Sequence, residues 1–324
     1  MLRAVVLAYS EVGFRCLQTL LAGGVDVPLV FTHEDAPQEN RWFGSVAELA
    51  RTHGIEVVTP RDPNTEEWLR RVARCAPQYL FSFYYRVLLG EPLLAAPAWG
   101  ALNMHGSLLP KYRGRAPVNW AILNGESETG ATLHYMTRKP DAGPIVAQET
   151  VPIGIDDTAL SVSLALADAA ARLLARCLPR LAAGPPQGRE MNLAEGSYFG
   201  GRTPEQGRLD GRWPAARIHN LIRAVAPPFP GAFADVAAGR LGFAGSHWTD
   251  EPAAHPEHAP CLYREGTSLY LDCIDARRLR IAGVALDGER LDAAAFTHRF
   301  GRAPLRLLTM KKGMHDEEAA HSRG

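Results

Sequence analysis

The chain has 324 residues, 46 % of them hydrophobic and 22 % charged, a composition typical of globular proteins rather than of disordered or fibrous ones. Lys and Arg number 35, as do Asp and Glu, so the net charge gives no basis for general attraction to nucleic acid or to an anionic membrane surface. We expect a cytoplasmic protein with reduced thiols, because the five cysteines are scattered and no cleavable leader pattern is found. We expect no membrane insertion, because no apolar run is long enough to cross a membrane.

Strand-like and helix-like segments alternate through the first hundred residues. Continuous apolar runs predict buried strands, and they lie at residues 2–9, 27–32, 56–58, 79–83 and 100–105. Helical spacing or capping residues predict helices between them, at residues 12–22, 45–54 and from 64 onward. This alternation predicts an α/β domain with a doubly wound, mostly parallel sheet, similar to a Rossmann fold.

The loop between the first predicted strand and helix lacks the glycine pattern of a dinucleotide-binding site. Glu34 and Asp35 supply an acid near the end of the second strand, but the loop at residues 10–13 contains only Gly13. A pyrophosphate needs several glycines there for close approach to the backbone. We therefore expect no NAD, and no phosphate-binding loop of the Gly-x-x-x-x-Gly-Lys-Ser/Thr type occurs in the chain.

The segment 100–115 carries the most distinctive chemistry. Asn103 and His105 are two residues apart in a predicted strand, so their side chains share a face. Gly106 and Pro110 end that strand, and open α/β sheets bind ligands at the carboxyl ends of their strands. Three cations follow at alternate positions: Lys111, Arg113 and Arg115. The pattern predicts a site for an anionic substrate.

A second acid follows in the chain. Residues 117–123 predict a short helix, and residues 131–136 and 144–151 predict two strands whose connection contains Asp141. Asp-Ala-Gly is ordinary turn chemistry, but a carboxylate at this place could orient His105. A long helix over residues 159–181 follows, opened by capping residues at 156–158.

The pattern changes after Arg202. A helix beginning at Pro214 is followed by short alternating runs such as 268–274 and 279–284, which predict a small β-rich, OB-like domain. We expect a catalytic domain over 1–203, the β-rich domain over 204–308 and a disordered tail over 309–324. Three possible metal ligands, His255, His258 and Cys261, lie in a Pro/Ala loop; we interpret them as chance neighbours and expect no metal site.

The combination of Asn103-Met-His105-Gly-Ser-Leu-Leu-Pro, the basic loop to Arg115 and Asp141-Ala-Gly resembles the N10-formyltetrahydrofolate-dependent formyltransferases. The resemblance continues into residues 222–233, Ile-Arg-Ala-Val-Ala-Pro-Pro-Phe-Pro-Gly-Ala-Phe. Stretches at 31–35, 81–86, 120–132 and 199–204 are most similar to the members that formylate UDP-4-amino-4-deoxy-L-arabinose in lipid A modification, a process linked to polymyxin resistance.

The resemblance implies an enzyme with N10-formyltetrahydrofolate as co-substrate and a UDP-amino sugar as acceptor. By this resemblance Asn103 would stabilise the oxyanion of a tetrahedral intermediate, His105 would transfer protons and Asp141 would hold the imidazolium. Positions that match folate contacts in similar enzymes are Val87, Leu88, Leu89, Arg115, Thr137, Arg138, Lys139, Pro140 and Asp141.

Three alternatives stay open at this point. Methionyl-tRNA formyltransferases share the catalytic motif, but residues 204–308 contain 13 Lys and Arg against 12 Asp and Glu, and a tRNA-binding domain is expected to be clearly basic. Another amino-sugar nucleotide could be the acceptor, or the chain could bind folate or nucleotide sugar without turnover.

Two-activity relatives carry a decarboxylase half with its own NAD fingerprint; no such fingerprint follows Arg202.

Overall fold

The structure is a computed structural model that describes residues 1–34 and 41–308. The chain forms two compact units. Of the described residues, the first unit contains 1–34, 41–117, 128–152 and 163–198, and the second contains 118–127, 153–162 and 199–308. The proposed tail at 309–324 lies outside the described residues.

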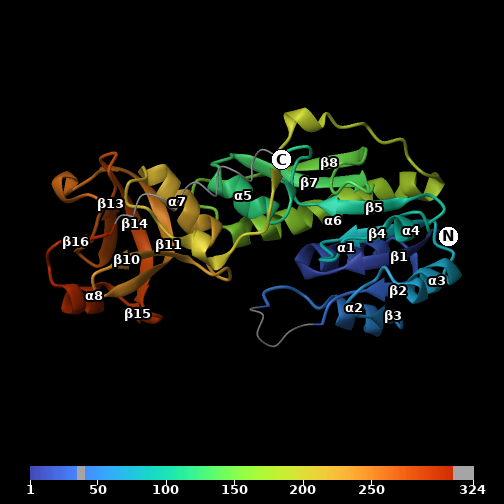
Figure 1. Ribbon diagram of the computed structural model, residues 1–324, viewed down its shortest axis with the longest axis horizontal. Helices are drawn as coiled ribbons and strands as arrows, with labels where there is room; N and C mark the ends of the chain where they lie inside the picture. The colour runs from blue at the N-terminus through green and yellow to red at the C-terminus, as the bar shows by residue number, and fades with distance from the viewer. Residues whose placement is uncertain (35–40, 309–324) are drawn as a thin grey trace. The chain divides into compact units, whose positions relative to one another are not determined.

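The first unit is built on a seven-stranded sheet with strand order β3-β2-β1-β4-β5-β7-β8 (Figure 1). The strands are β1 (Arg3–Ala8), β2 (Asp26–Phe31), β3 (Glu56–Val58), β4 (Tyr79–Phe83), β5 (Ala101–His105), β7 (Glu128–Tyr135) and β8 (Ile145–Pro152). The first five pair in parallel, whereas β5–β7 and β7–β8 pair antiparallel. The predicted mostly parallel α/β fold is confirmed.

Helices cover both faces of this sheet. On one face, α3 (Glu66–Arg74) and α4 (Glu91–Leu94) pack on alternate residues of the central strands, such as Val5 and Leu7. On the other, α1 (Ser10–Ala22) packs on β1 and β4, and α6 (Ala159–Ala183) runs beside α1, joined to it by the Arg15–Asp168 ion pair at 2.9 Å. The near-continuous apolar strands are thus buried on both sides, as a parallel sheet requires.

The starts of two helices show where prediction from local sequence agrees with the structure and where it does not. Before α2 (Val46–Thr52), the Ser45 hydroxyl accepts a hydrogen bond from the Glu48 N–H at 3.2 Å, which confirms the helix start predicted at residue 45. The helix predicted from residue 64 onward is α3, but its N-cap is Thr65, whose side chain makes no capping hydrogen bond. The Asn64 side chain instead binds the loop after β4, as described below.

The second unit contains an antiparallel sheet that forms a near-closed barrel, with strand order β10-β11-β14-β13-β12-β16 and β15 paired to β14. Its strands are β10 (Ala232–Val236), β11 (Gly239–Pro252), β12 (Cys261–Glu265), β13 (Ser268–Asp272), β14 (Arg277–Leu286), β15 (Glu289–Leu291) and β16 (Leu305–Arg306). Helices α7 (Ala215–Ala224) and α8 (Ala293–Phe300) and parts of α5 (Pro117–Leu123) complete it. The predicted β-rich second domain is confirmed.

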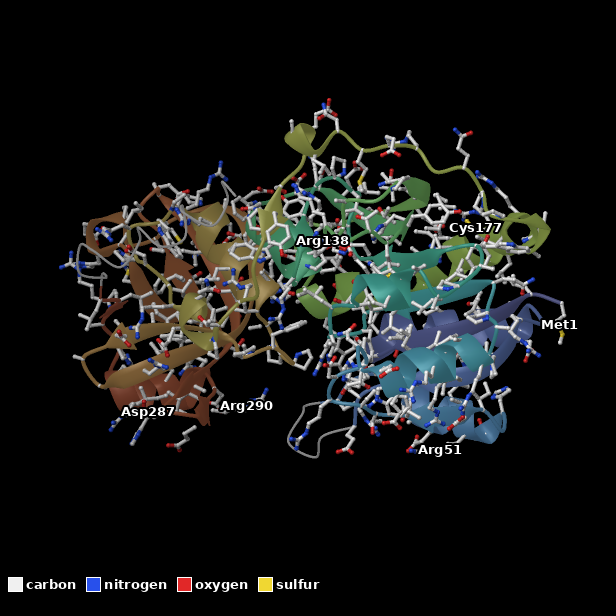
Figure 2. The ribbon with its side chains drawn as sticks, turned by 45° about the vertical axis from the view of Figure 1, so that its right-hand side comes forward. Met1, Arg51, Arg138, Cys177, Asp287 and Arg290 are labelled. Carbon is white, nitrogen blue, oxygen red and sulfur yellow. The ribbon has the colours of Figure 1, made fainter. Side chains whose placement is uncertain are left out.

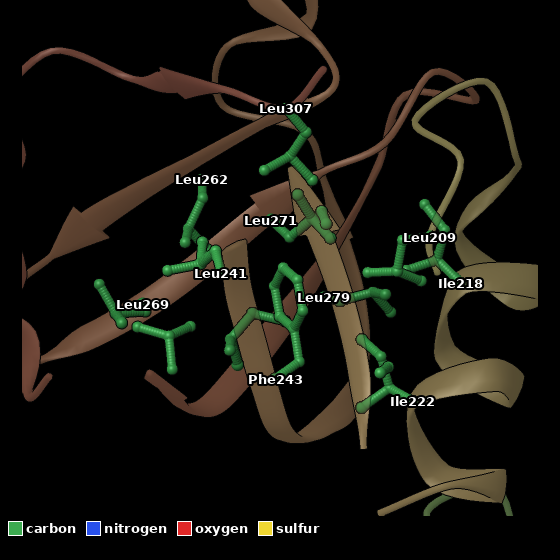
Figure 3. Packing of buried hydrophobic residues seen from close by; sticks show 14 of the residues in the cluster. Leu209, Ile218, Ile222, Leu241, Phe243, Leu262, Leu269, Leu271, Leu279 and Leu307 are labelled. Atoms are coloured by element: carbon green, nitrogen blue, oxygen red, sulfur yellow. The ribbon is translucent and has the colours of Figure 1, made fainter. Parts of the chain in front are cut away.

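The core of this unit lies between α7 and the barrel (Figure 3). Ile218 and Ile222, four residues apart on one face of α7, contact a cluster that includes Leu241, Phe243 and Leu279. Short elements complete the chain: β6 (Arg113–Gly114), β9 (Tyr198–Phe199) and three 3-10 turns, Leu193–Glu195, Pro204–Gly207 and Pro256–His258. No helix within the described residues is long and apolar enough to cross a membrane.

Candidate active site

The site lies at the carboxyl end of β5, beside the end of β4. Strands β2 and β3 lie on one side of β1, and strands β4 and β5 lie on the other. Where the strand order reverses in this way, a crevice is expected at the carboxyl ends of the central strands. Asn103 and His105 are on the same face of β5, as predicted from their spacing. His105 is buried, with only 6 % of its surface exposed.

Hydrogen bonds fix the orientation of the His105 ring. Its Nε2 lies 2.8 Å from the backbone carbonyl oxygen of Tyr112, so Nε2–H donates to that carbonyl. Its Nδ1 faces Asp141 Oδ1 at 3.5 Å. The ring nitrogen with an available lone pair is therefore Nδ1, because Nε2 carries the proton that is donated to the carbonyl.

Asp141 is held in place from two directions. Its backbone has φ of +51°, a left-handed conformation that Asp tolerates better than most residues. Its Oδ2 accepts a hydrogen bond from the Gly114 N–H at 2.9 Å, which leaves Oδ1 toward His105. Gly143 allows this turn, since a Cβ there would overlap the carbonyl oxygen of Tyr135.

A fourth polar side chain, His134 on β7, belongs to the same cluster. Its Nδ1–H donates to the Tyr135 carbonyl at 2.8 Å, and its Nε2 accepts from the Asn103 side-chain amide at 3.1 Å. Nε2 also lies 3.7 Å from Asp141 Oδ1. Burial, more than any neighbouring charge, lowers the pKa of His134, so the ring is neutral at pH 7 and suited to accept this bond.

Sequence reasoning missed His134 because its partner is set by the sheet. Asn103 and His134 are directly opposite each other in the antiparallel β5–β7 pairing. A strand-like alternation over residues 131–136 places His134 on one face, but it does not say which strand is the neighbour. The available signal was an imidazole within a mostly apolar run.

Comparison with known families decides the classification. Residues 6–178 match the family model described as formyl transferase, and residues 202–301 match the formyl transferase C-terminal domain. The chain belongs to the formyl transferase family. It is therefore a formyltransferase by enzyme class.

Solved structures share the fold of this formyl transferase. WlaRD, described as a sugar 3N-formyl transferase, is 18 % identical with a TM-score of 0.69, over 90 % of this chain and 98 % of that one. An N-formyltransferase from Helicobacter canadensis, in complex with folinic acid and dTDP-3-aminofucose, is 20 % identical with a TM-score of 0.71, over 90 % and 100 %. HypX from Aquifex aeolicus, in complex with tetrahydrofolic acid, is 16 % identical with a TM-score of 0.63, over 92 % of this chain and 47 % of that one.

The loop after β4 contains the first group of expected folate contacts, Val87 to Leu89. Leu88 is 72 % exposed, an unusual position for a large apolar side chain. The Asn64 side chain holds this loop: its amide donates to the Leu88 carbonyl at 3.1 Å and its Oδ1 accepts from the Gly90 N–H at 2.6 Å. The exposed apolar tip is thereby presented on a fixed backbone.

The remaining expected contacts lie in the basic loop and in the β7–β8 connection. Arg115 is exposed. Thr137 donates its hydroxyl to the Lys139 carbonyl at 3.0 Å, which tightens the connection. The Arg138 side chain, labelled in Figure 2, is 87 % exposed. Its Nε lies 3.7 Å from Glu91 Oε1 of α4. The exposed cations and the partly buried Pro140 surround the turn that places Asp141.

Tyr84 is a further residue at this strand end. It follows β4 directly and has φ of +58°, a strained conformation for an aromatic residue. Its hydroxyl lies so close to Gly106 that a Cβ at that position would overlap it. Burial, with a smaller contribution from the Asp141 charge, raises the pKa of Tyr84, so the phenol stays protonated.

Proposed function

We propose that this formyl transferase moves the formyl group of N10-formyltetrahydrofolate to the 4-amine of UDP-4-amino-4-deoxy-L-arabinose, the step used in lipid A modification. The observation that carries the proposal is the side-chain cluster in which Asp141 faces both His105 and His134 and in which His134 binds Asn103, within the established family. Folate ligands in three structural relatives and an amino-sugar nucleotide in one of them support the substrate classes.

In the proposed reaction the neutral amine attacks the formyl carbon, and the resulting tetrahedral intermediate carries an oxyanion. The free N–H of the Asn103 amide donates to that oxygen, a type of interaction that typically contributes about 3 kcal/mol. Nδ1 of His105 accepts the proton that the amine loses and returns it to N10 as the carbon–N10 bond breaks. Asp141 stabilises the imidazolium between these steps.

Variants of these three residues test the assignment. We expect Asn103→Ala to lower kcat by roughly a hundredfold or more and His105→Ala to lower it by roughly 10²–10⁴-fold, with Asp141→Ala in the same range. Folate affinity, measured by calorimetry with folinic acid, should change little for Asn103 and His105. A kcat equal to that of the parent in any of the three would remove that residue from the mechanism. His258→Ala, a change at an exposed side chain, is the control.

The acceptor is tested by a panel of amines. The parent chain is incubated with N10-formyltetrahydrofolate and with UDP-4-amino-4-deoxy-L-arabinose, dTDP-3-aminofucose or methionyl-tRNA, and the formylated product is measured. The arabinose nucleotide should have the highest kcat/KM. Preference for the dTDP sugar would reassign the acceptor, and saturable tRNA binding with a steep salt dependence would favour the tRNA enzyme.

A further inference from the structure

Arg113 is a buried cation whose guanidinium has no partner among the residues that the structure describes. It is 6 % exposed, and its Nε is buried with no hydrogen-bond acceptor. Across residues 1–34 and 41–308, its guanidinium makes no hydrogen bond, ion pair or ring contact. Lys111 and Arg115, its basic neighbours in sequence, are both exposed. The left-handed backbone of Tyr112 (φ +57°) interrupts the alternation that would place all three on one face.

An unpaired buried guanidinium is costly. Desolvation of an ion costs several kcal/mol unless an opposite charge and hydrogen bonds compensate it, and an Arg side chain cannot escape by losing its proton. Arg223 in the second unit shows the compensated case. It is 4 % exposed, and its guanidinium donates to the Gly154 and Asp157 carbonyls, both at 3.1 Å, and to Asn220 Oδ1.

The backbone on both sides of Arg113 is bound to the proposed catalytic side chains. The preceding carbonyl, of Tyr112, accepts the His105 Nε2–H, and the following N–H, of Gly114, donates to Asp141. The Arg113 N–H itself donates to the Ser197 carbonyl at 3.0 Å. The position of Arg113 relative to His105 and Asp141 is therefore fixed, and so is the position of a ligand that pairs with its guanidinium.

We propose that Arg113 binds the diphosphate of the nucleotide-sugar acceptor, an assignment that rests on the proposed function. The planar guanidinium matches phosphate oxygens with two parallel hydrogen bonds, and such pairs are strongest where water is excluded. The diphosphate is the permanent anion of the acceptor and is connected through the sugar to the amine that reacts. The exposed Arg115 is the cation expected to contact folate, so the two basic residues serve different substrates.

The test compares two buried arginines by thermal unfolding and calorimetry of the full chain. Without ligand, Arg223→Met should lower the Tm because it removes a paired group, whereas Arg113→Met should leave the Tm unchanged or raise it. Arg113→Met should weaken UDP binding by roughly thirtyfold or more and leave folinic acid binding within twofold. Arg113→Lys, which keeps the charge but loses the fork, should bind UDP with intermediate affinity.

Each contrary result has one meaning. A fall in Tm for Arg113→Met comparable to that for Arg223→Met makes Arg113 a structural residue and overturns the proposal. Loss of folinic acid binding with UDP binding intact also overturns it and assigns the guanidinium to a folate carboxylate. If Arg113→Met binds UDP as tightly as the parent chain, and the parent formylates the amino-sugar nucleotide, only the Arg113 assignment is overturned. Loss of UDP binding in a chain that formylates no amino-sugar nucleotide supports the phosphate site and overturns only the proposed function.

Discussion

At the scale of single residues, the chemistry of the site depends on which nitrogen of each histidine ring carries the proton and which has a free lone pair. His105 has its Nε2–H bound to a carbonyl, so the nitrogen with an available lone pair is Nδ1. His134 has the opposite arrangement: Nδ1–H is bound to a carbonyl and the Nε2 lone pair accepts from Asn103. In the proposed mechanism the two histidines have different roles: His105 would transfer a proton, and His134 fixes the Asn103 amide.

A pair of His134 variants tests this second role. His134→Phe leaves the Asn103 amide without its acceptor, a loss of about 1–3 kcal/mol, so we expect kcat to fall roughly ten- to hundredfold. The KM for both substrates should change little, because only the orientation of an oxyanion donor is lost. His134→Gln, which offers an amide oxygen, should recover part of the rate. Equal kcat values for the Phe variant and the parent would contradict a positioning role.

At the scale of elements, loops are fixed by side chains from distant segments. Asn64, which precedes α3, closes two hydrogen bonds on the loop after β4. In the second unit, His219 of α7 holds the loop before α6: its Nε2–H donates to the Ile155 carbonyl at 2.8 Å and its Nδ1 accepts from the Ser246 hydroxyl at 2.8 Å. Each contact replaces water at backbone groups that a loop would otherwise leave unpaired.

Asn64→Ala tests the loop after β4. Two hydrogen bonds of about 1 kcal/mol each are lost, so the loop should sample other conformations and the Kd for folinic acid should rise roughly five- to thirtyfold. The kcat at saturating folate should stay within about twofold, since no reacting group is touched. Asn192→Ala is the control, because that side chain caps an exposed turn elsewhere. An unchanged Kd would separate this loop from folate binding.

At the scale of the whole molecule, each unit contains a neutral histidine in its interior. His134 and His219 are 1 % and 0 % exposed, and burial is the main cause that lowers the pKa of each. In the unfolded chain both rings have an ordinary pKa of about 6.5. As pH falls below that value, the unfolded chain takes up protons that the folded rings resist, so folding stability declines.

Urea denaturation at pH 7.5 and at pH 5.5 measures this decline. The parent should lose free energy of unfolding between the two, and the variant His134→Gln/His219→Gln should lose less, although it starts from a lower value. Both buried rings then no longer contribute to the pH dependence. The same loss in parent and variant would show that other groups, such as the carboxylates, are responsible for the acid sensitivity.

The sequence by itself determined the local structure and the chemical inventory. Apolar runs gave the parallel strands because a strand buried on both faces has to be apolar throughout, and the two-residue spacing of Asn103 and His105 placed them on one face of β5. Ser45 identified a helix start because its hydroxyl competes locally for a backbone N–H. These features depend on neighbours in the chain.

Only the tertiary structure decided the contacts between distant segments. The antiparallel register of β5 and β7 placed His134 against Asn103, and packing buried Arg113 while its basic neighbours stayed exposed. Asn64 satisfied the loop after β4 rather than the helix that follows it in sequence. Strand pairing and burial bring together residues tens of positions apart, and they determine which polar groups lose water and therefore need a partner.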